Sequence, residues 1–190
     1  MNNFLDTCVI IANFDEIESH HKRAKEFIGG NERFLISEFQ KSNEIPGLFL
    51  RKRRSVMKIL KFIMTQTLDL EGYGNKKIEL KELLKKYSLE NPTKENLNEL
   101  IGILNGLERK VDDFINLKIE KIIPNCTNKK LIKSLEIVNM PDAKIIASAL
   151  IEHQTNPLIL NTLDKKDWEK KKIKRACYRN DFNIPQVNYL

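Results

Sequence analysis

The apolar positions of this chain predict strands near both ends of the sequence. The run at 4–11 has apolar residues on both faces and many β-branched residues, a pattern typical of a buried parallel strand. Further short strands are predicted at 33–37, 121–123 and 158–161, and the segment 184–190 fits an edge strand.

Segments with helical periodicity fill the rest of the pattern. The predicted helices span 16–28, 38–64, 77–87, 93–117, 128–135 and 141–153, with a Lys-rich helix starting near 165. The helix at 38–64 is expected to break or kink near Pro46, because proline lacks the amide hydrogen that a helix interior uses. Strands and helices alternate around a helical middle, so the sequence predicts one α/β domain with a helical insertion at about 51–125.

Composition narrows the class of protein. The 190 residues can bury one sizeable core, and 41% of them are hydrophobic, which predicts a folded chain. The sequence has neither a long apolar run nor a basic leader, so we expect no membrane span and no cleaved signal peptide. Cys8, Cys126 and Cys177 show no pairing motif, which fits a cytoplasmic protein, and Cys8 is expected to be a small buried hydrophobe.

The charge balance favours a polyanionic partner. Lys and Arg number 33 against 26 Asp and Glu, giving a net charge of +7. Two basic clusters stand out, and their candidate nucleic-acid-binding residues are Arg51, Lys52, Arg53, Arg54, Lys171 and Lys172. Such clusters are often only solvated helix faces, so they bear on function only if they flank an acidic site.

Three aspartates occupy positions that stability alone does not explain. Asp6 interrupts the apolar run at 4–11, where a carboxylate is costly unless it is paired, bound to a metal or capping a helix at the strand's end. Asp142 offsets the dipole of a helix start, but it also lies on that helix's apolar stripe and is expected to point toward the sheet. Asp164 follows a predicted strand, and sites in open α/β sheets form beyond the carboxyl ends of strands.

A fourth carboxylate is expected from the helix after the second strand. Glu38 and Glu44 both qualify, and periodicity does not separate them. Converging carboxylates repel one another and raise their pKa values unless a cation joins them. Ligands that are all oxygen suit Mg²⁺ or Mn²⁺, and two such ions can bind the attacking and leaving oxygens of a phosphodiester. The pattern therefore favours a metal-dependent phosphodiester hydrolase.

Four motifs together resemble the PIN-domain family. The first three motifs match, in chain order, Leu5-Asp6-Thr7-Cys8-Val9-Ile10, Ser37 to Glu44, and Asp142-Ala143-Lys144-Ile145-Ile146-Ala147-Ser148-Ala149. The fourth motif matches Thr162-Leu163-Asp164 followed by Asp167-Trp168. The family's second acidic residue lies some turns after a strand that ends in serine, which favours Glu44 over Glu38. The resemblance covers roughly 3–50 and 128–190, and it departs from compact members in the helical segment between them.

The resemblance implies a three-layer α/β/α fold with a central parallel sheet. It also implies an endoribonuclease that hydrolyses RNA with Mg²⁺ or Mn²⁺ held by Asp6, Glu44, Asp142 and Asp164. In this interpretation the Thr162 hydroxyl steadies the acidic cluster, and Asp167 supports the ligands or replaces one of them.

Several biological roles are compatible with such a nuclease. As the toxin of a toxin–antitoxin pair, the protein would bind an antitoxin protein, and family members often form homodimers. A non-catalytic RNA-binding or assembly module and a structure-specific RNA or DNA processing nuclease are the alternatives that stay open.

Overall fold

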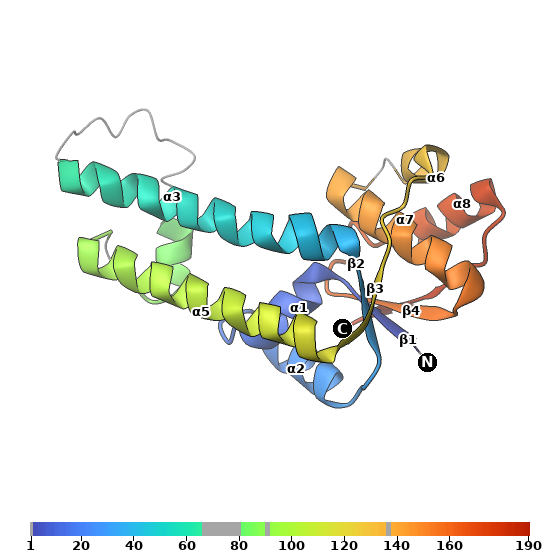
Figure 1. Ribbon diagram of the computed structural model, residues 1–190, viewed down its shortest axis with the longest axis horizontal. Coiled ribbons are helices and arrows are strands. Elements are labelled where there is room, and N and C mark those ends of the chain that lie inside the picture. Colours follow the sequence, from blue (N-terminus) through green and yellow to red (C-terminus); the bar gives the residue numbers. More distant parts are fainter. Residues whose placement is uncertain (1, 66–80, 90–91, 136–137) are drawn as a thin grey trace. The chain divides into compact units, whose positions relative to one another are not determined.

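Two compact units make up the chain in the computed structural model, which describes residues 2–65, 81–89, 92–135 and 138–190 (Figure 1). The first, here called the sheet unit, combines Met1–Ile45 with Val111–Leu190. The second, the helical unit, is Pro46–Lys110. The helical insertion was predicted at about 51–125, but residues 111–123 belong to the sheet unit because they lead into and form one of its strands.

The sheet unit is built on parallel strands, five of them among the described residues. They are β1 (Asn2–Leu5), β2 (Phe34–Ser37), β3 (Ile119–Ile123), β4 (Leu158–Thr162) and β5 (Gln186–Tyr189), in the order β3-β2-β1-β4-β5. Every neighbouring pair is parallel. After β1 the chain adds β2 and β3 on one side of that strand, and it then crosses over to add β4 and β5 on the other side. The switch point therefore lies between β1 and β4, where open α/β sheets place ligands beyond the carboxyl ends of their strands.

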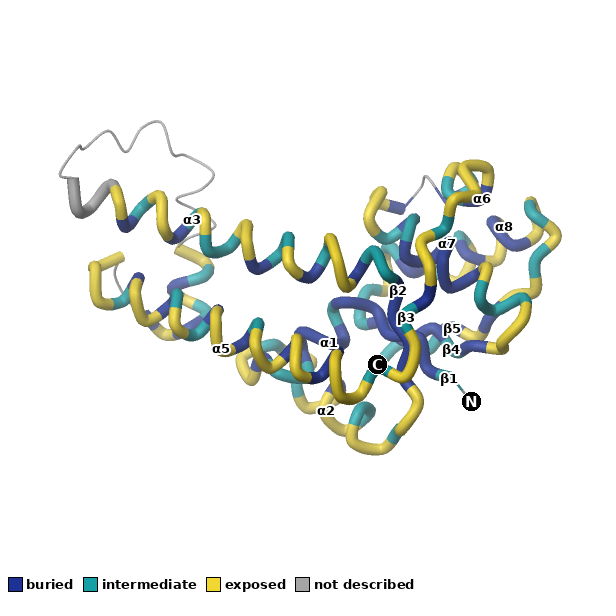
Figure 2. Tube along the Cα trace, in the orientation of Figure 1, coloured by how far each residue is buried: buried dark blue, intermediate teal, exposed yellow. Residues whose placement is uncertain are grey.

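Helices cover both faces of this sheet (Figure 1). They are α1 (Thr7–Phe14), α2 (His21–Gly29), α6 (Lys129–Ser134), α7 (Met140–Thr155) and α8 (Lys170–Asn180). Because strand side chains alternate, Phe4 and Leu160 join the core with α7 and α8, whereas Phe34 contacts Phe27 of α2 on the other face. Figure 2 shows β1, β2 and β4 and the middle of α7 as mostly buried, whereas much of β3 is exposed. The predicted α/β class with three layers and a parallel central sheet is confirmed.

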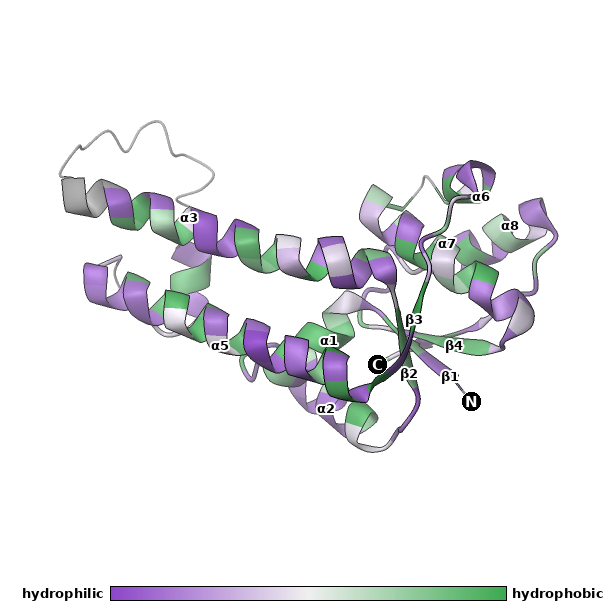
Figure 3. Cartoon of the chain, viewed as in Figure 1, coloured by the Kyte–Doolittle hydropathy of each residue, from purple (hydrophilic) through white to green (hydrophobic). Residues whose placement is uncertain are grey.

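The helical unit has a core of its own. It contains most of α3 (Ile45–Thr65) and α5 (Lys94–Lys118), together with a helix at 81–86. Both long helices alternate hydrophilic and hydrophobic residues along their length (Figure 3), as amphipathic helices do. One cluster of buried residues joins α3, α5 and the helix at 81–86, and it includes Val56, Leu60, Leu84, Leu97, Leu100 and Leu104. No helix in the described parts of the chain is long and apolar enough to cross a membrane.

The largest difference from the predicted elements concerns the run at 4–11, which is not one strand. Strand β1 ends at Leu5 and helix α1 begins at Thr7, with Asp6 extended between them. An apolar run of this length fits a buried strand and a buried helix equally well, and Val9 and Ile10 are fully buried in the helix. Asp6 therefore stands at the carboxyl end of β1 and not inside a strand.

Most other predicted elements are confirmed with small shifts. Helix α2 begins at His21, later than predicted, and α8 begins at Lys170. The helix at 38–64 is interrupted by a π-helical turn, η1 (Gln40–Glu44), directly before Pro46, where a break was expected. The predicted helix at 77–87 is described from residue 81 onward, and its first residues lie outside the described ranges.

Candidate metal centre

Asp6 and Thr162 meet at the switch point of the sheet. Asp6 follows β1 directly and is 4% exposed, and Thr162 is the last residue of the neighbouring strand β4. The Thr162 hydroxyl donates a hydrogen bond of 2.6 Å to Oδ2 of Asp6, and the Cys8 thiol donates to the same oxygen at 2.7 Å. The Asp6 side chain makes no capping hydrogen bond to α1, so helix capping does not explain this carboxylate.

The surroundings of Asp6 shift the pKa of its carboxyl group. Burial raises the pKa from 3.8 to about 7, although the hydrogen bonds from Cys8 and Thr162 lower it. The negative charges of Asp142 and Glu44 raise it further. Asp6 at the end of β1, Glu44 of η1 and Asp142 of α7 are therefore close enough for their charges to interact.

Three aspartates form the tightest acidic cluster in the described part of the chain. Asp142, Asp164 and Asp167 each offer one carboxylate oxygen, and these oxygens all lie within 4.8 Å of one another. All three residues are half-buried. A single cation can contact three oxygens at such spacing, so this triad could hold a metal ion. Asp167, expected to support the ligands or to replace one of them, is a member of this triad.

The turn after β4 positions two members of the triad. The amide of Asp164 donates to the Thr162 hydroxyl at 2.9 Å, so this one hydroxyl contacts both Asp6 and Asp164. Oδ1 of Asp164 accepts from the amides of Lys166, at 2.8 Å, and Asp167, at 3.0 Å. Such an aspartate turn is a local preference of the sequence, and it brings Asp167 back toward Asp164.

Asn139 joins the first turn of α7 to the triad. Its Oδ1 accepts from the Asp142 amide at 3.1 Å and so caps the helix. Its Nδ2 donates to the Asp142 carboxylate and, at 2.7 Å, to Oδ2 of Asp167. Sequence reasoning missed this residue, although an asparagine two positions before Pro141 is a recognisable helix-start signal.

Trp168 anchors Asp142 from the core. The indole is fully buried, its ring stacks on Phe4 with a centroid distance of 6.3 Å, and Nε1 donates to Oδ1 of Asp142 at 3.2 Å. Burial raises the pKa of Asp142, the hydrogen bonds from Trp168 and Asn139 lower it, and the charges of Asp167 and Asp164 raise it. The aromatic residue noted in the sequence is thus a direct contact of a candidate ligand.

Glu44, and not Glu38, belongs to the acidic site. The Thr7 hydroxyl donates to the Glu44 carboxylate, and the buried Gln40 donates to that hydroxyl at 3.2 Å and to the Leu5 carbonyl at 2.8 Å. Glu38 instead accepts from the Ser42 hydroxyl at 2.6 Å. Gln40 carried no signal in the sequence, because the acceptors of its Nε2 group, the Leu5 carbonyl and the Thr7 hydroxyl, lie 35 and 33 positions away.

Cys8 is not the small buried hydrophobe that was predicted. It is half-buried, its thiol donates to Asp6, and its sulfur accepts from the Leu163 amide at 3.3 Å. Burial and the charge of Asp6 raise the pKa of the thiol, so Cys8 stays protonated and acts as a donor.

The candidate nucleic-acid-binding residues fall in different units. Lys171 and Lys172 lie in the first turn of α8 in the sheet unit, and the Lys172 ammonium donates to the Lys166 carbonyl at 2.6 Å. The other four lie on α3 in the helical unit, where Arg51 and Arg54 are exposed and Lys52 is half-buried. Arg53 is bound within that unit by Glu108 and Asn105.

The donor set fits a hard divalent cation. The candidate ligands Asp142, Asp164, Asp167, Asp6 and Glu44 offer carboxylate oxygens, which such cations prefer. A cation among them would lower the raised pKa values of Asp6 and Asp142. Fold and site together define a doubly wound α/β protein with a candidate metal centre at its switch point.

Comparison of the chain with protein-family models, with curated proteins and with solved structures finds no match. The geometry of the site and the resemblance of its motifs therefore bear on its function.

Proposed function

We propose that the protein is a divalent-metal-dependent endoribonuclease that hydrolyses RNA phosphodiesters. The observation that carries the proposal is the triad of Asp142, Asp164 and Asp167, whose carboxylate oxygens lie within 4.8 Å of one another. The triad lies at the carboxyl end of a parallel sheet, beside the buried Asp6. The cation is Mg²⁺ or Mn²⁺, because the donors are carboxylates.

Neighbouring side chains orient the candidate ligands through hydrogen bonds. Thr162 and Cys8 both donate to Oδ2 of Asp6, which fixes the orientation of the carboxylate. Trp168 and Asn139 donate to Asp142, one to each carboxylate oxygen, and so fix its orientation. When bound, the cation supplies Lewis-acid stabilisation of the charge on the phosphate oxygens. Ligands held by such surrounding hydrogen bonds lose little freedom when they bind, which favours both metal affinity and catalysis.

RNA is the proposed substrate for two reasons. The net charge of +7 favours a polyphosphate partner, and the motifs resemble those of a family that cleaves RNA. Arg51, Lys52, Lys171 and Lys172 are the residues we assign to phosphate binding. The toxin role, an antitoxin partner and a homodimer stay predictions of the resemblance.

The test is cleavage of a labelled mixed-sequence RNA with Mg²⁺ or Mn²⁺ and with EDTA. We expect cleavage that requires the metal, that is lost in Asp142→Asn and that persists in Asp113→Asn, a matched control at an exposed position on α5. Calorimetry on the same proteins measures metal binding separately. Wild-type protein that binds neither Mg²⁺ nor Mn²⁺ would refute the proposal, as would equal cleavage by wild type and Asp142→Asn.

A further inference from the structure

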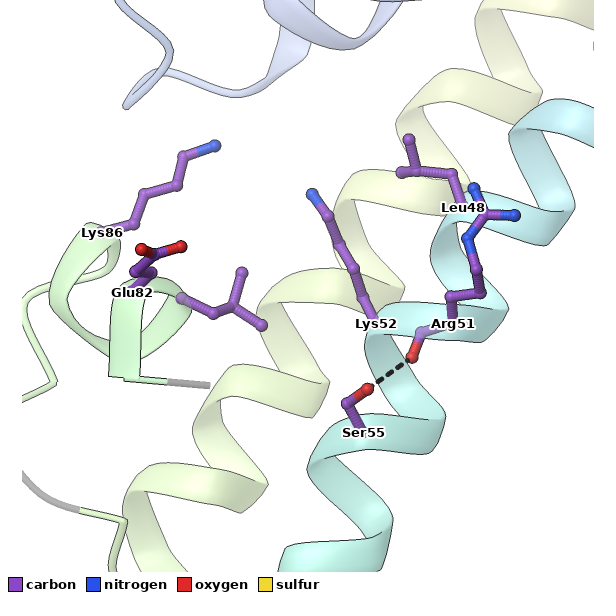
Figure 4. Close-up of a pocket in the computed structure, with 7 residues that line it drawn as sticks. Leu48, Arg51, Lys52, Ser55, Glu82 and Lys86 are labelled. Atoms are coloured by element: carbon purple, nitrogen blue, oxygen red, sulfur yellow. Dashed lines mark hydrogen bonds between the residues drawn. The ribbon is translucent and has the colours of Figure 1, made fainter. Parts of the chain in front are cut away.

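The helical unit contains a pocket of about 380 Å³ between two of its helices (Figure 4). Four lining residues come from α3 and three from the helix at 81–86: Leu48, Arg51, Lys52, Ser55, Glu82, Leu83 and Lys86. The volume falls in the range of about 300–1,000 Å³ typical of small-ligand sites.

The lining combines positive charge with apolar surface. Arg51, Lys52 and Lys86 contribute three cations and Glu82 one carboxylate, so two positive charges are in excess. The side chains of Leu48 and Leu83 add apolar walls, and the methylene stems of the lysines extend them. Figure 4 shows Lys52 and Lys86 reaching from different helices, with Glu82 beside Lys86. A ligand that matches this lining carries anionic groups next to a surface that packs against aliphatic side chains, such as the face of a nucleobase.

We propose that this pocket binds one nucleotide of a single-stranded RNA. Arg51, Lys52 and Lys86 contact its phosphodiester oxygens, and the base packs against Leu48 and Leu83. Proteins bind single-stranded RNA with basic side chains along the backbone and with surfaces that pack against the faces of unstacked bases, and here Leu48 and Leu83 supply the surface for the base. The inference rests on the proposed function, from which it takes RNA as the polyanion.

Only some residues of the basic cluster at 51–54 line this pocket. Arg51 and Lys52 line it, whereas Arg53 is bound by Glu108 and Asn105, and Arg54 is exposed elsewhere on α3. Lys86, which no sequence pattern singled out, joins them from another helix. The structure therefore assigns different roles to neighbouring residues of the same charge.

The test compares two double variants that each remove two positive charges from the same two helices. Lys52→Gln/Lys86→Gln alters the pocket, and Arg54→Gln/Lys85→Gln is the control outside it. Fluorescence anisotropy with a short labelled single-stranded RNA in EDTA measures affinity at several salt concentrations. We expect the pocket variant to bind about tenfold more weakly and to lose about 1.4 from the salt slope, since each phosphate contact contributes about 0.7. The control should bind nearly as the wild type.

A third variant tests the apolar wall. Leu48→Ala should weaken binding of this RNA but leave its salt slope unchanged, because it removes no charge. Circular dichroism and the melting temperature of each variant confirm that it is folded.

The outcomes separate the pocket from the metal centre. Equal weakening by both double variants would mean diffuse surface charge and would overturn the pocket proposal, as would an unchanged affinity in the pocket variant. A wild-type protein that binds RNA through the pocket but never cleaves it would overturn the nuclease proposal alone.

Discussion

The hydroxyl of Thr162 donates to Oδ2 of Asp6 at 2.6 Å, and this contact joins residues 156 positions apart in the sequence. The same hydroxyl accepts from the Asp164 amide at 2.9 Å. One side chain at the end of β4 therefore orients a carboxylate at the end of β1 and begins the turn that carries Asp164. The arrangement exists because β1 and β4 are parallel neighbours.

Thr162→Val tests this double role, because valine keeps the shape of threonine and lacks its hydroxyl. We expect the free energy of unfolding to fall by about 1–3 kcal/mol, since the Asp164 amide and the Asp6 carboxylate each lose a buried partner. Metal affinity should fall about tenfold or more, as it does when a group that orients a ligand is removed. Urea unfolding and calorimetry with Mn²⁺ measure the two effects. Thr162→Ser retains the hydroxyl and should restore most of both.

The raised pKa of Asp6 predicts how pH changes the stability of the metal-free protein. The folded state holds a proton that the unfolded state releases, so the free energy of unfolding should fall as pH rises from about 4 to about 7. Asp6→Asn removes this cost and should be more stable than wild type by roughly 2–4 kcal/mol near pH 8, with little difference near pH 4. Denaturant unfolding across this range provides the measurement. A difference that does not change with pH would contradict the assignment.

Saturating Mg²⁺ should make the free energy of unfolding depend less on pH. A cation favours the ionised form of the carboxylates, so its binding releases protons and becomes tighter as pH rises. Calorimetry in buffers of different ionisation enthalpy counts the released protons. An affinity for Mg²⁺ that is constant between about pH 5 and about pH 8 would place the cation away from Asp6 and Asp142.

Trp168 is the one tryptophan of the chain, and it contacts a candidate metal ligand. We therefore expect Mn²⁺ to change its fluorescence, with a midpoint that matches the calorimetric affinity and weakens in Asp142→Asn. Trp168→Phe keeps an aromatic ring beside Phe4 but loses the hydrogen bond to Asp142, so it should reduce metal affinity about tenfold. Metal binding without any change in emission would place the ion elsewhere.

Arg53 and Glu108 pair between α3 and α5, with Nη2 of Arg53 3.1 Å from Oε1 of Glu108. Bidentate geometry and partial burial favour a coupling energy near 1 kcal/mol, at the upper end for surface ion pairs. A double-mutant cycle with Arg53→Gln and Glu108→Gln measures it. Arg53→Gln should leave affinity for single-stranded RNA within about twofold of wild type. A tenfold loss would show that this arginine binds phosphate after all.

Much of the fold and several of the candidate site residues could be predicted from local patterns. Apolar periodicity places β2, α5, α7 and β4 within one or two residues of their observed bounds. Asp6 and Asp164 were identifiable because each interrupts or follows a strand, and Asp142 because it faces inward from a helix start. The division of the run at 4–11 into β1 and α1 was not predictable, since a short apolar run fits either structure.

The sequence by itself determined that strands and helices alternate, and that acidic residues stand at strand ends and at a helix start, because these depend on neighbours a few positions away. Only the tertiary structure decided which of them meet. Glu44 and not Glu38 faces Asp6, Asn139 joins Asp142 to Asp167, and Lys86 shares a pocket with Lys52. These contacts join elements far apart in the chain, and they depend on the strand order and on helix packing, which no local pattern encodes.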